Sequence, residues 1–120
     1  MTALDLITSE NPKALYAVLP KVIAVADSGS VITRDHAVGI LIKLAGIRQY
    51  ADKVFALLIE QLKKAPTNQL PMYAENALPI INGKNKALFI KTLSMRIDEV
   101  EKESKKKRIE KVMNKITKAN

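Results

Sequence analysis

The residues best placed to do chemistry lie near the C-terminus, where two stripes of different character share one predicted helix. The basic stripe consists of Lys107, Lys111, Lys115 and Lys118. The apolar stripe consists of Ile109, Val112, Met113 and Ile116. At roughly 100° per residue the two stripes lie about 150° apart. A cationic ridge of this kind can contact phosphates, an anionic lipid surface or an acidic partner helix. It can also be the polar outer face that keeps a terminal helix soluble, and both interpretations stay open.

The other reactive residue types form no catalytic or metal-binding constellation. The chain has no cysteine and a single histidine, His36, so neither a thiolate site nor a multi-histidine site is expected. The segment Gly83-Lys84-Asn85-Lys86 lacks the spacing and the preceding strand of a phosphate-binding loop. No carboxylates stand at helical spacing with a histidine, as a helical di-metal site requires. We therefore expect no cofactor, no metal and no enzymatic activity.

The positive charge is concentrated in the last helix. Residues 102–120 contain eight basic and two acidic residues, which is +6 of the net +8. Nucleic-acid binding along this helix is therefore the alternative function. Aromatic residues make up only 4% of the chain, there is no Trp, and arginines do not cluster. Base stacking and bidentate base recognition use those residues, so a protein partner is favoured.

Composition favours one all-α domain in residues 1–120. Apolar residues make up 48% of the chain and charged residues 27%, with only 4 Gly and 5 Pro. Such a chain contains enough apolar surface to fold and few of the turn-formers that an all-β fold needs. The N-terminus has no basic region before its apolar residues, and no apolar run approaches the roughly 18 residues of a membrane span. We expect no membrane span and, with no cysteine, a cytoplasmic location.

Six segments carry apolar residues at three- and four-residue spacing and predict helices. The predicted helices span residues 11–26, 34–45, 50–64, 70–81, 87–97 and 102–116. Pro20 is expected to bend the first helix, Thr33 to cap the second, and Gly46 to close it. These helices form three antiparallel pairs at about residues 11–46, 47–82 and 84–117, with residues 1–10 as an N-terminal cap.

The helix pairs align as an imperfect repeat. Tyr16, Phe55 and Phe89 occupy one position of the first helices, at spacings of 39 and 34 residues. Leu41, Leu78 and Val112 occupy one position of the second helices, at spacings of 37 and 34 residues. Periods of this length are typical of stacked helix-hairpin arrays.

The first pair resembles the HEAT repeat, a family in which a Leu-Pro bends the first helix, an Asp opens the turn, and a Val-Arg-x-x-Ala opens the second helix. The residues that carry the resemblance are Leu19, Pro20, Asp27, Arg34, Ala37 and Leu41, with Thr33 where Val is usual. The second pair departs from the pattern, with Pro71 at the Arg position, and the third keeps the hydrophobic ladder alone. Armadillo repeats share these features, so the subtype stays open. We expect Asp27 and Arg34 to form an ion pair that locks the turn.

The resemblance implies an α–α superhelix whose second helices line a concave surface that holds proteins or, less often, nucleic acid. We predict a protein-binding or scaffolding module. A DNA-glycosylase-like enzyme, which also occurs among HEAT-like folds, would need an aromatic pocket that two Phe, three Tyr and no Trp do not favour. Two further possibilities are a hydrophobic groove along residues 34–45 and a homo-oligomer formed through the segment Leu4–Ile7.

Overall fold

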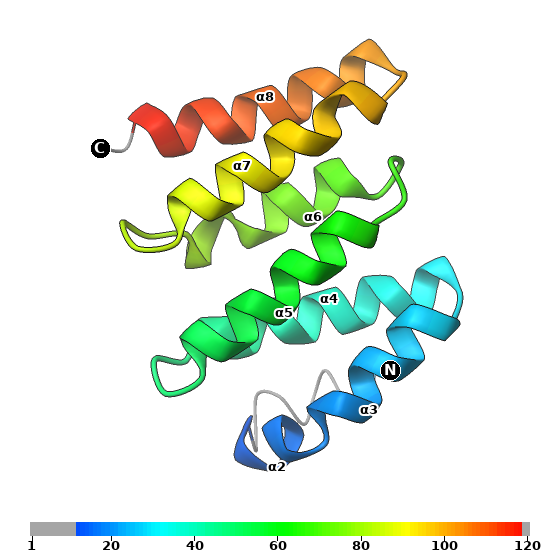
Figure 1. Cartoon of the computed structure of the whole chain (residues 1–120), viewed down its shortest axis with the longest axis vertical. Coiled ribbons are helices and arrows are strands. Elements are labelled where there is room, and N and C mark those ends of the chain that lie inside the picture. Colours follow the sequence, from blue (N-terminus) through cyan, green and yellow to red (C-terminus); the bar gives the residue numbers. More distant parts are fainter. Residues whose placement is uncertain (1–11, 119–120) are drawn as a thin grey trace. The chain divides into compact units, whose positions relative to one another are not determined.

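The computed structural model describes residues 12–118, which form helices and no strand (Figure 1). The all-α class predicted from composition is therefore confirmed. The α-helices are α2 (Pro12–Ala17), α3 (Leu19–Ser28), α4 (Val31–Ala45), α5 (Ala51–Lys64), α6 (Leu70–Ala77), α7 (Lys86–Arg96) and α8 (Glu103–Lys118). Two short 3₁₀ helices, η1 (Leu78–Ile80) and η2 (Ile97–Glu99), follow α6 and α7. The predicted cap at residues 1–10 lies outside the described residues. Within the described part of the chain, no helix is long and apolar enough to cross a membrane.

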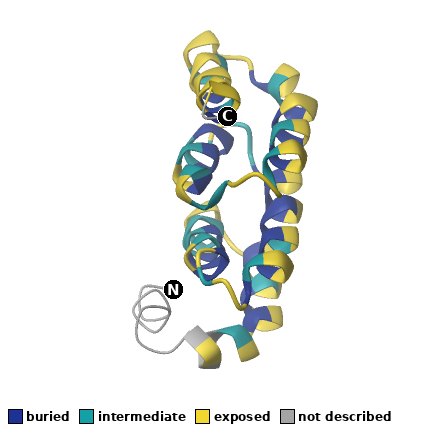
Figure 2. Ribbon diagram, turned by 90° about the vertical axis from the view of Figure 1, so that its left-hand side faces the viewer, coloured by how far each residue is buried: buried dark blue, intermediate teal, exposed yellow. Residues whose placement is uncertain are grey.

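The chain forms two compact units, Met1–Leu58 and Ile59–Asn120, and α5 runs through the boundary. In the first unit α3 packs against α4. In the second unit α6 and α7 both pack against α8. The helices bury one side and expose another (Figure 2). No buried side-chain nitrogen or oxygen among residues 12–118 lacks a hydrogen-bond partner.

The first predicted helix is interrupted at Val18 and is not continuously curved. Val18 has φ −101° and ψ 9°, which separates α2 from α3, and Pro20 lies in the first turn of α3. Pro20 has no N–H to donate to the carbonyl four residues back, and its ring crowds that carbonyl. A helix start is the place where a missing N–H causes no loss. The prediction that Pro20 bends one continuous helix is therefore wrong, because Pro20 lies in the first turn of a separate helix.

The start of α4 differs from the sequence prediction. Ser30, not Thr33, caps α4: its Oγ accepts a hydrogen bond from the Thr33 backbone N at 3.3 Å. Ser30 has the extended conformation of an N-cap residue, with φ −73° and ψ 170°, so the helix begins three residues earlier than predicted. Gly46 closes α4 as predicted, in right-handed helical conformation.

The core of the first unit lies between α3 and α4 and extends to the aromatic residues beside α5. The buried residues of α3 and α4 are Leu19, Val22, Ala26, Ala37, Val38, Ile40, Leu41, Leu44 and Ala45. The rings of Tyr16 and Tyr50 stack with centroids 4.4 Å apart, and Lys53 Nζ lies 5.6 Å from the centroid of the Tyr16 ring.

The helix predicted at residues 70–81 is α-helical only to Ala77. It continues as η1, because Pro79 cannot donate to the carbonyl of Glu75 and the chain tightens to three-residue hydrogen bonding. The turn that follows is held by two asparagines. Asn82 Oδ1 accepts from the backbone N of Lys84 at 2.8 Å and of Asn85 at 3.1 Å, and Asn85 Oδ1 accepts from Asn82 N at 2.8 Å. These bonds fix the entry into α7.

The core of the second unit is formed by the inner sides of α6, α7 and α8 together with the end of α5. Its buried apolar residues include Leu62, Leu70, Tyr73, Ala74, Ala77, Phe89, Leu93, Ile109, Val112 and Ile116. The predicted apolar stripe of the last helix therefore lies in this core, with Met113 half-buried.

Candidate functional site

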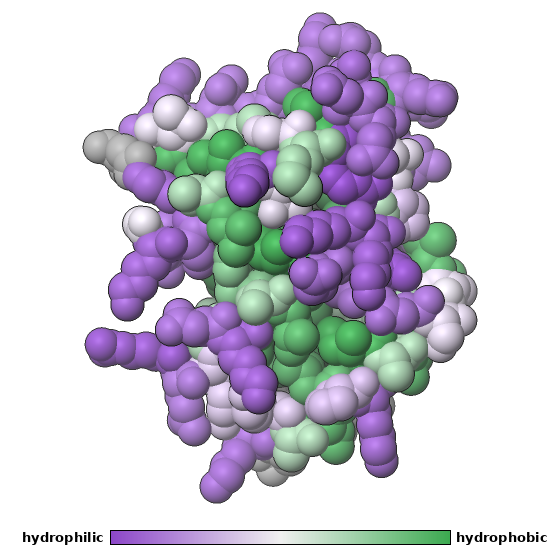
Figure 3. All heavy atoms as spheres, viewed as in Figure 1, coloured by the Kyte–Doolittle hydropathy of each residue, from purple (hydrophilic) through white to green (hydrophobic). Residues whose placement is uncertain are grey.

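The lysines singled out from the sequence lie together on the outer face of α8. Lys107, Lys111, Lys115 and Lys118 are all exposed and border one shallow surface hollow together with Glu110 and Asn114. We call these four residues the α8 lysine face. In Figure 3, hydrophilic side chains cover the upper right of the view, where α8 begins, and hydrophobic side chains are also visible toward its C-terminal end. The predicted separation of a basic and an apolar stripe is therefore present in the structure.

Other basic residues of α8 hold the helix on its unit. Arg108 forms a two-point ion pair with Glu75 of α6, at 3.0 Å from Nε to Oε2 and 2.5 Å from Nη2 to Oε1. Lys105 Nζ donates to Asn68 Oδ1 at 3.0 Å. By contrast, no hydrogen bond or ion pair to the described residues involves the α8 lysine face. The charge of this helix is therefore divided between structural anchors and cations directed to solvent.

Glu75 interacts electrostatically with two lysines of the α8 lysine face, although it forms no ion pair with them. The hydrogen bond from Arg108 is the main cause that lowers the pKa of Glu75, and the charges of Arg108, Lys111 and Lys115 lower it further. Partial burial opposes the shift. Because Glu75 is already occupied by Arg108, it leaves the two lysines available to an external anion.

The spacing of the α8 lysine face opposes helix stability. Lys107 and Lys111 stand four residues apart, and so do Lys111 and Lys115. Like charges at this spacing destabilise a helix by about 0.2–0.5 kcal/mol per pair. Glu110 makes no ion pair with the lysine face that would offset this repulsion. Apart from Glu110, which borders the same hollow, the face therefore carries charge of one sign.

A small cleft lies at one end of the α8 lysine face. It has a volume of about 230 Å³ and is lined by Leu78, Ile81, Asn82, Gly83, Lys86, Lys115 and Ile116. We call it the Lys86–Lys115 cleft. Small-molecule sites usually measure about 300–1,000 Å³, so this volume suits a side chain better than a cofactor. Three of its lining residues are aliphatic and two are lysines.

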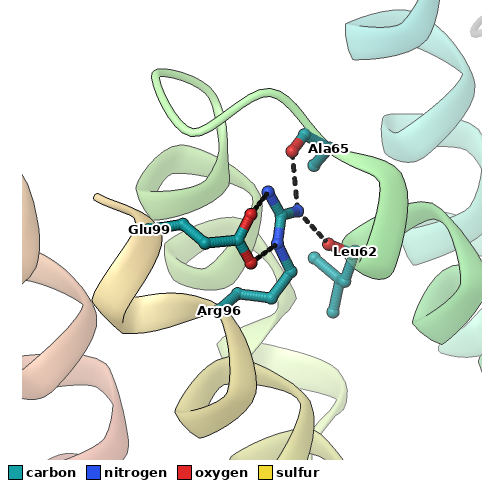
Figure 4. Close-up of polar contacts among 4 residues, drawn as sticks. All are labelled: Leu62, Ala65, Arg96 and Glu99. Carbon is teal, nitrogen blue, oxygen red and sulfur yellow. Dashed lines mark hydrogen bonds and ion pairs between the residues drawn. The ribbon is translucent and has the colours of Figure 1, made fainter. Parts of the chain in front are cut away.

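Arg96 was not identified from the sequence, although its side chain donates four hydrogen bonds within the second unit (Figure 4). Its Nη1 donates to the backbone carbonyls of Leu62 at 2.8 Å and Ala65 at 2.6 Å, at the end of α5. Its Nε and Nη2 donate to the Glu99 carboxylate at 3.0 and 3.3 Å. Arg96 is only 9% exposed, and it supplies donors and positive charge where α5 lacks intrahelical partners. This role is structural. The spacing of Arg96 and Glu99 signals their ion pair, but nothing in the sequence signals the carbonyl acceptors.

The residues that carry the HEAT resemblance lie in the first unit. Leu19, Ala37 and Leu41 are buried there, whereas Pro20 and Asp27 are exposed and Arg34 is half-buried. The ion pair predicted between Asp27 and Arg34 is confirmed, with Oδ1 and Nη1 3.9 Å apart. Three of these six residues therefore contribute to the core of the first unit, and two form an ion pair.

Along residues 34–45, where a groove was considered, most of the apolar residues of α4 are buried, and only Ile42 of the extra stripe is half-buried. A different apolar groove of about 530 Å³ lies in the first unit. It is lined by Tyr16, Ala17, Leu19, Pro20, Ile23, Lys53 and Leu57. Lys53 is its one charged lining residue, so the groove offers little chemistry by which a partner could be specified.

Among residues 12–118, no group of three or more His, Asp or Glu side chains is arranged to hold a metal ion. His36 is half-buried on α4. The α8 lysine face and the adjoining Lys86–Lys115 cleft are therefore the surface with the most definite chemistry. In comparisons with known proteins, no family model, curated protein or solved structure matches this chain.

Proposed function

We propose that this protein is a non-enzymatic binding module that uses the α8 lysine face to hold an acidic segment of a partner protein. The observation that carries the proposal is the set of four exposed lysines, none of which forms an ion pair with a described acidic residue. Their same-sign spacing opposes folding, and an anionic partner would relieve that repulsion on binding.

We further propose that the helices belong to a HEAT-like α–α array of about three pairs, of HEAT or armadillo subtype. The supporting observations are the helix start at Pro20, the Asp27–Arg34 ion pair and the burial of Leu41. A scaffolding role follows from this resemblance alone. A cytoplasmic location and self-association stay predictions of the sequence.

Nucleic-acid or anionic-surface binding through the same lysines is the second candidate function, because phosphate groups also bind exposed cations. The arginine of α8 that could make two-point phosphate contacts, Arg108, is instead occupied by Glu75. The tyrosines Tyr16 and Tyr50 belong to the first unit, where their rings stack on each other. A protein carboxylate is therefore the better fit.

The test is a fluorescence-anisotropy titration with a labelled, glutamate-rich amphipathic peptide at low and physiological salt. Wild type is compared with the double variant Lys111→Glu, Lys115→Glu. A double variant Lys21→Glu, Lys91→Glu is the control, because it changes two exposed lysines outside the face and has the same net charge. Random single-stranded and duplex DNA are titrated in parallel.

We expect the peptide to bind wild type and the control alike, and to bind the Lys111, Lys115 variant about tenfold more weakly, which corresponds to about 1.4 kcal/mol. Equal affinity for all three proteins would contradict the proposal. If DNA binds more tightly than the peptide, and this DNA binding is lost in the Lys111, Lys115 variant, the surface is a nucleic-acid-binding site instead.

A further inference from the structure

The Lys86–Lys115 cleft adds an apolar floor to the end of the α8 lysine face. Leu78 and Ile81 come from η1 and the residue after it, and Ile116 comes from the last turns of α8. Lys115 belongs to both surfaces, so the cleft and the lysine face are continuous. Lys86, at the start of α7, is the second cation of the cleft.

The volume and lining of the cleft define what fits it. At about 230 Å³ it can accept one or two aliphatic side chains, and its floor offers aliphatic contacts to them. Its cations are Lys86 and Lys115, and no acidic residue lines it. A ligand that fits therefore carries an apolar side chain with carboxylates on both sides of it.

We infer that the Lys86–Lys115 cleft is an anchor pocket that receives a leucine-like side chain from the acidic segment of the partner. This inference rests on the proposed function, and it adds the sequence character of the partner. Carboxylates beside the anchor contact Lys86 and Lys115, and further carboxylates follow Lys111 and Lys107 along α8. An apolar anchor surrounded by charge is the usual arrangement of a small binding interface.

Gly83 is a lining residue of the cleft at which a larger side chain can be added without a clash. It lines the cleft, a Cβ added there meets no heavy atom within 4 Å, and no described glycine has positive φ. A Gly83→Leu variant should therefore fold, and it adds a bulky apolar side chain at a residue that lines the cleft. Lys86→Glu removes one cation of the cleft, and Lys91→Glu is its matched control on the same helix.

The experiment uses two labelled, glutamate-rich peptides that differ only in the central residue, leucine or serine. They are titrated by fluorescence anisotropy against the full chain and its Gly83→Leu, Lys86→Glu and Lys91→Glu variants. Circular dichroism confirms that each variant is folded. We expect wild type and Lys91→Glu to bind the leucine peptide about tenfold more tightly than the serine peptide. In Gly83→Leu the difference between the peptides should vanish, and Lys86→Glu should weaken the binding of both.

Each other outcome has a definite meaning. If both peptides bind wild type equally and Gly83→Leu has no effect, the anchor pocket is refuted while the proposed function stands. If neither peptide binds, the proposed function fails and the anchor pocket fails with it. If random DNA displaces the leucine peptide at lower concentration than an unlabelled copy of that peptide, the surface serves nucleic acid and the inference is overturned.

Discussion

Arg96 is expected to be the most important single polar side chain for the stability of the second unit. The variant Arg96→Ala removes both donors to the carbonyls of Leu62 and Ala65, which are 0% and 1% exposed residues. A buried carbonyl left without a donor costs about 1–3 kcal/mol. Two such carbonyls together cost about 2–6 kcal/mol of stability. Water that enters the vacated space can donate hydrogen bonds to them, which reduces this cost. We therefore expect a loss of about 3 kcal/mol in the free energy of unfolding.

Urea denaturation followed by far-ultraviolet circular dichroism measures this loss. With a slope of about 2 kcal/mol per molar urea, the midpoint should fall by about 1.5 M. Glu99→Ala is the matched comparison, because it removes the other partner of Arg96 but leaves the two carbonyl bonds. Glu99 has a side chain that is 54% exposed, so its loss should cost less than about 1 kcal/mol. Equal losses in the two variants, or a loss below about 1 kcal/mol in Arg96→Ala, would refute the assignment of Arg96 as a cap of α5.

Two glycines should respond in opposite ways to alanine. A Cβ at Gly29 would lie 2.6 Å from the backbone oxygen of Val25, so Gly29→Ala should destabilise the first unit by about 1–3 kcal/mol in urea denaturation. A Cβ at Gly39, inside α4, meets nothing within 4 Å, so Gly39→Ala should stabilise by about 0.5–1 kcal/mol, and the reverse order would contradict the described backbone. The lowered pKa of Glu75 predicts a stabilising contribution that is present at neutral pH and lost as the pH falls through that lowered value. In an NMR titration the Glu75 pKa should rise in Arg108→Met; an unchanged value would show that Arg108 is not the cause.

The helices were predictable from the sequence because apolar periodicity and turn residues act locally. The predicted span 50–64 agrees with α5 to one residue, and the predicted stripe of Ile109, Val112 and Ile116 is buried as expected. The start of α4 was predicted wrongly because two nearby residues both favour a helix N-cap. Ser30 and Thr33 are both suitable caps, and only the extended conformation of Ser30 decides between them.

Tertiary contacts were less accessible to sequence reasoning. The bonds from Arg96 to the carbonyls of Leu62 and Ala65 span more than thirty residues, and backbone acceptors carry no side-chain signal. Counting charges in the sequence does not distinguish the basic residues of α8 that anchor the helix from those that face solvent. The pairing of Arg108 with Glu75 makes this distinction visible in the structure. The Lys86–Lys115 cleft was missed for the same reason, because its lining comes from η1, the following turn, α7 and α8.

Binding of an acidic protein segment by the α8 lysine face can be observed residue by residue. Its most direct test is NMR mapping of backbone amide shifts when the glutamate-rich leucine peptide is added to the isotope-labelled full chain. We expect saturable shifts that cluster in residues 103–118 and in Asn82, Gly83 and Lys86, and that disappear in the Lys111→Glu, Lys115→Glu variant. Shifts confined to the first unit, or shifts that persist unchanged in that variant, would contradict it.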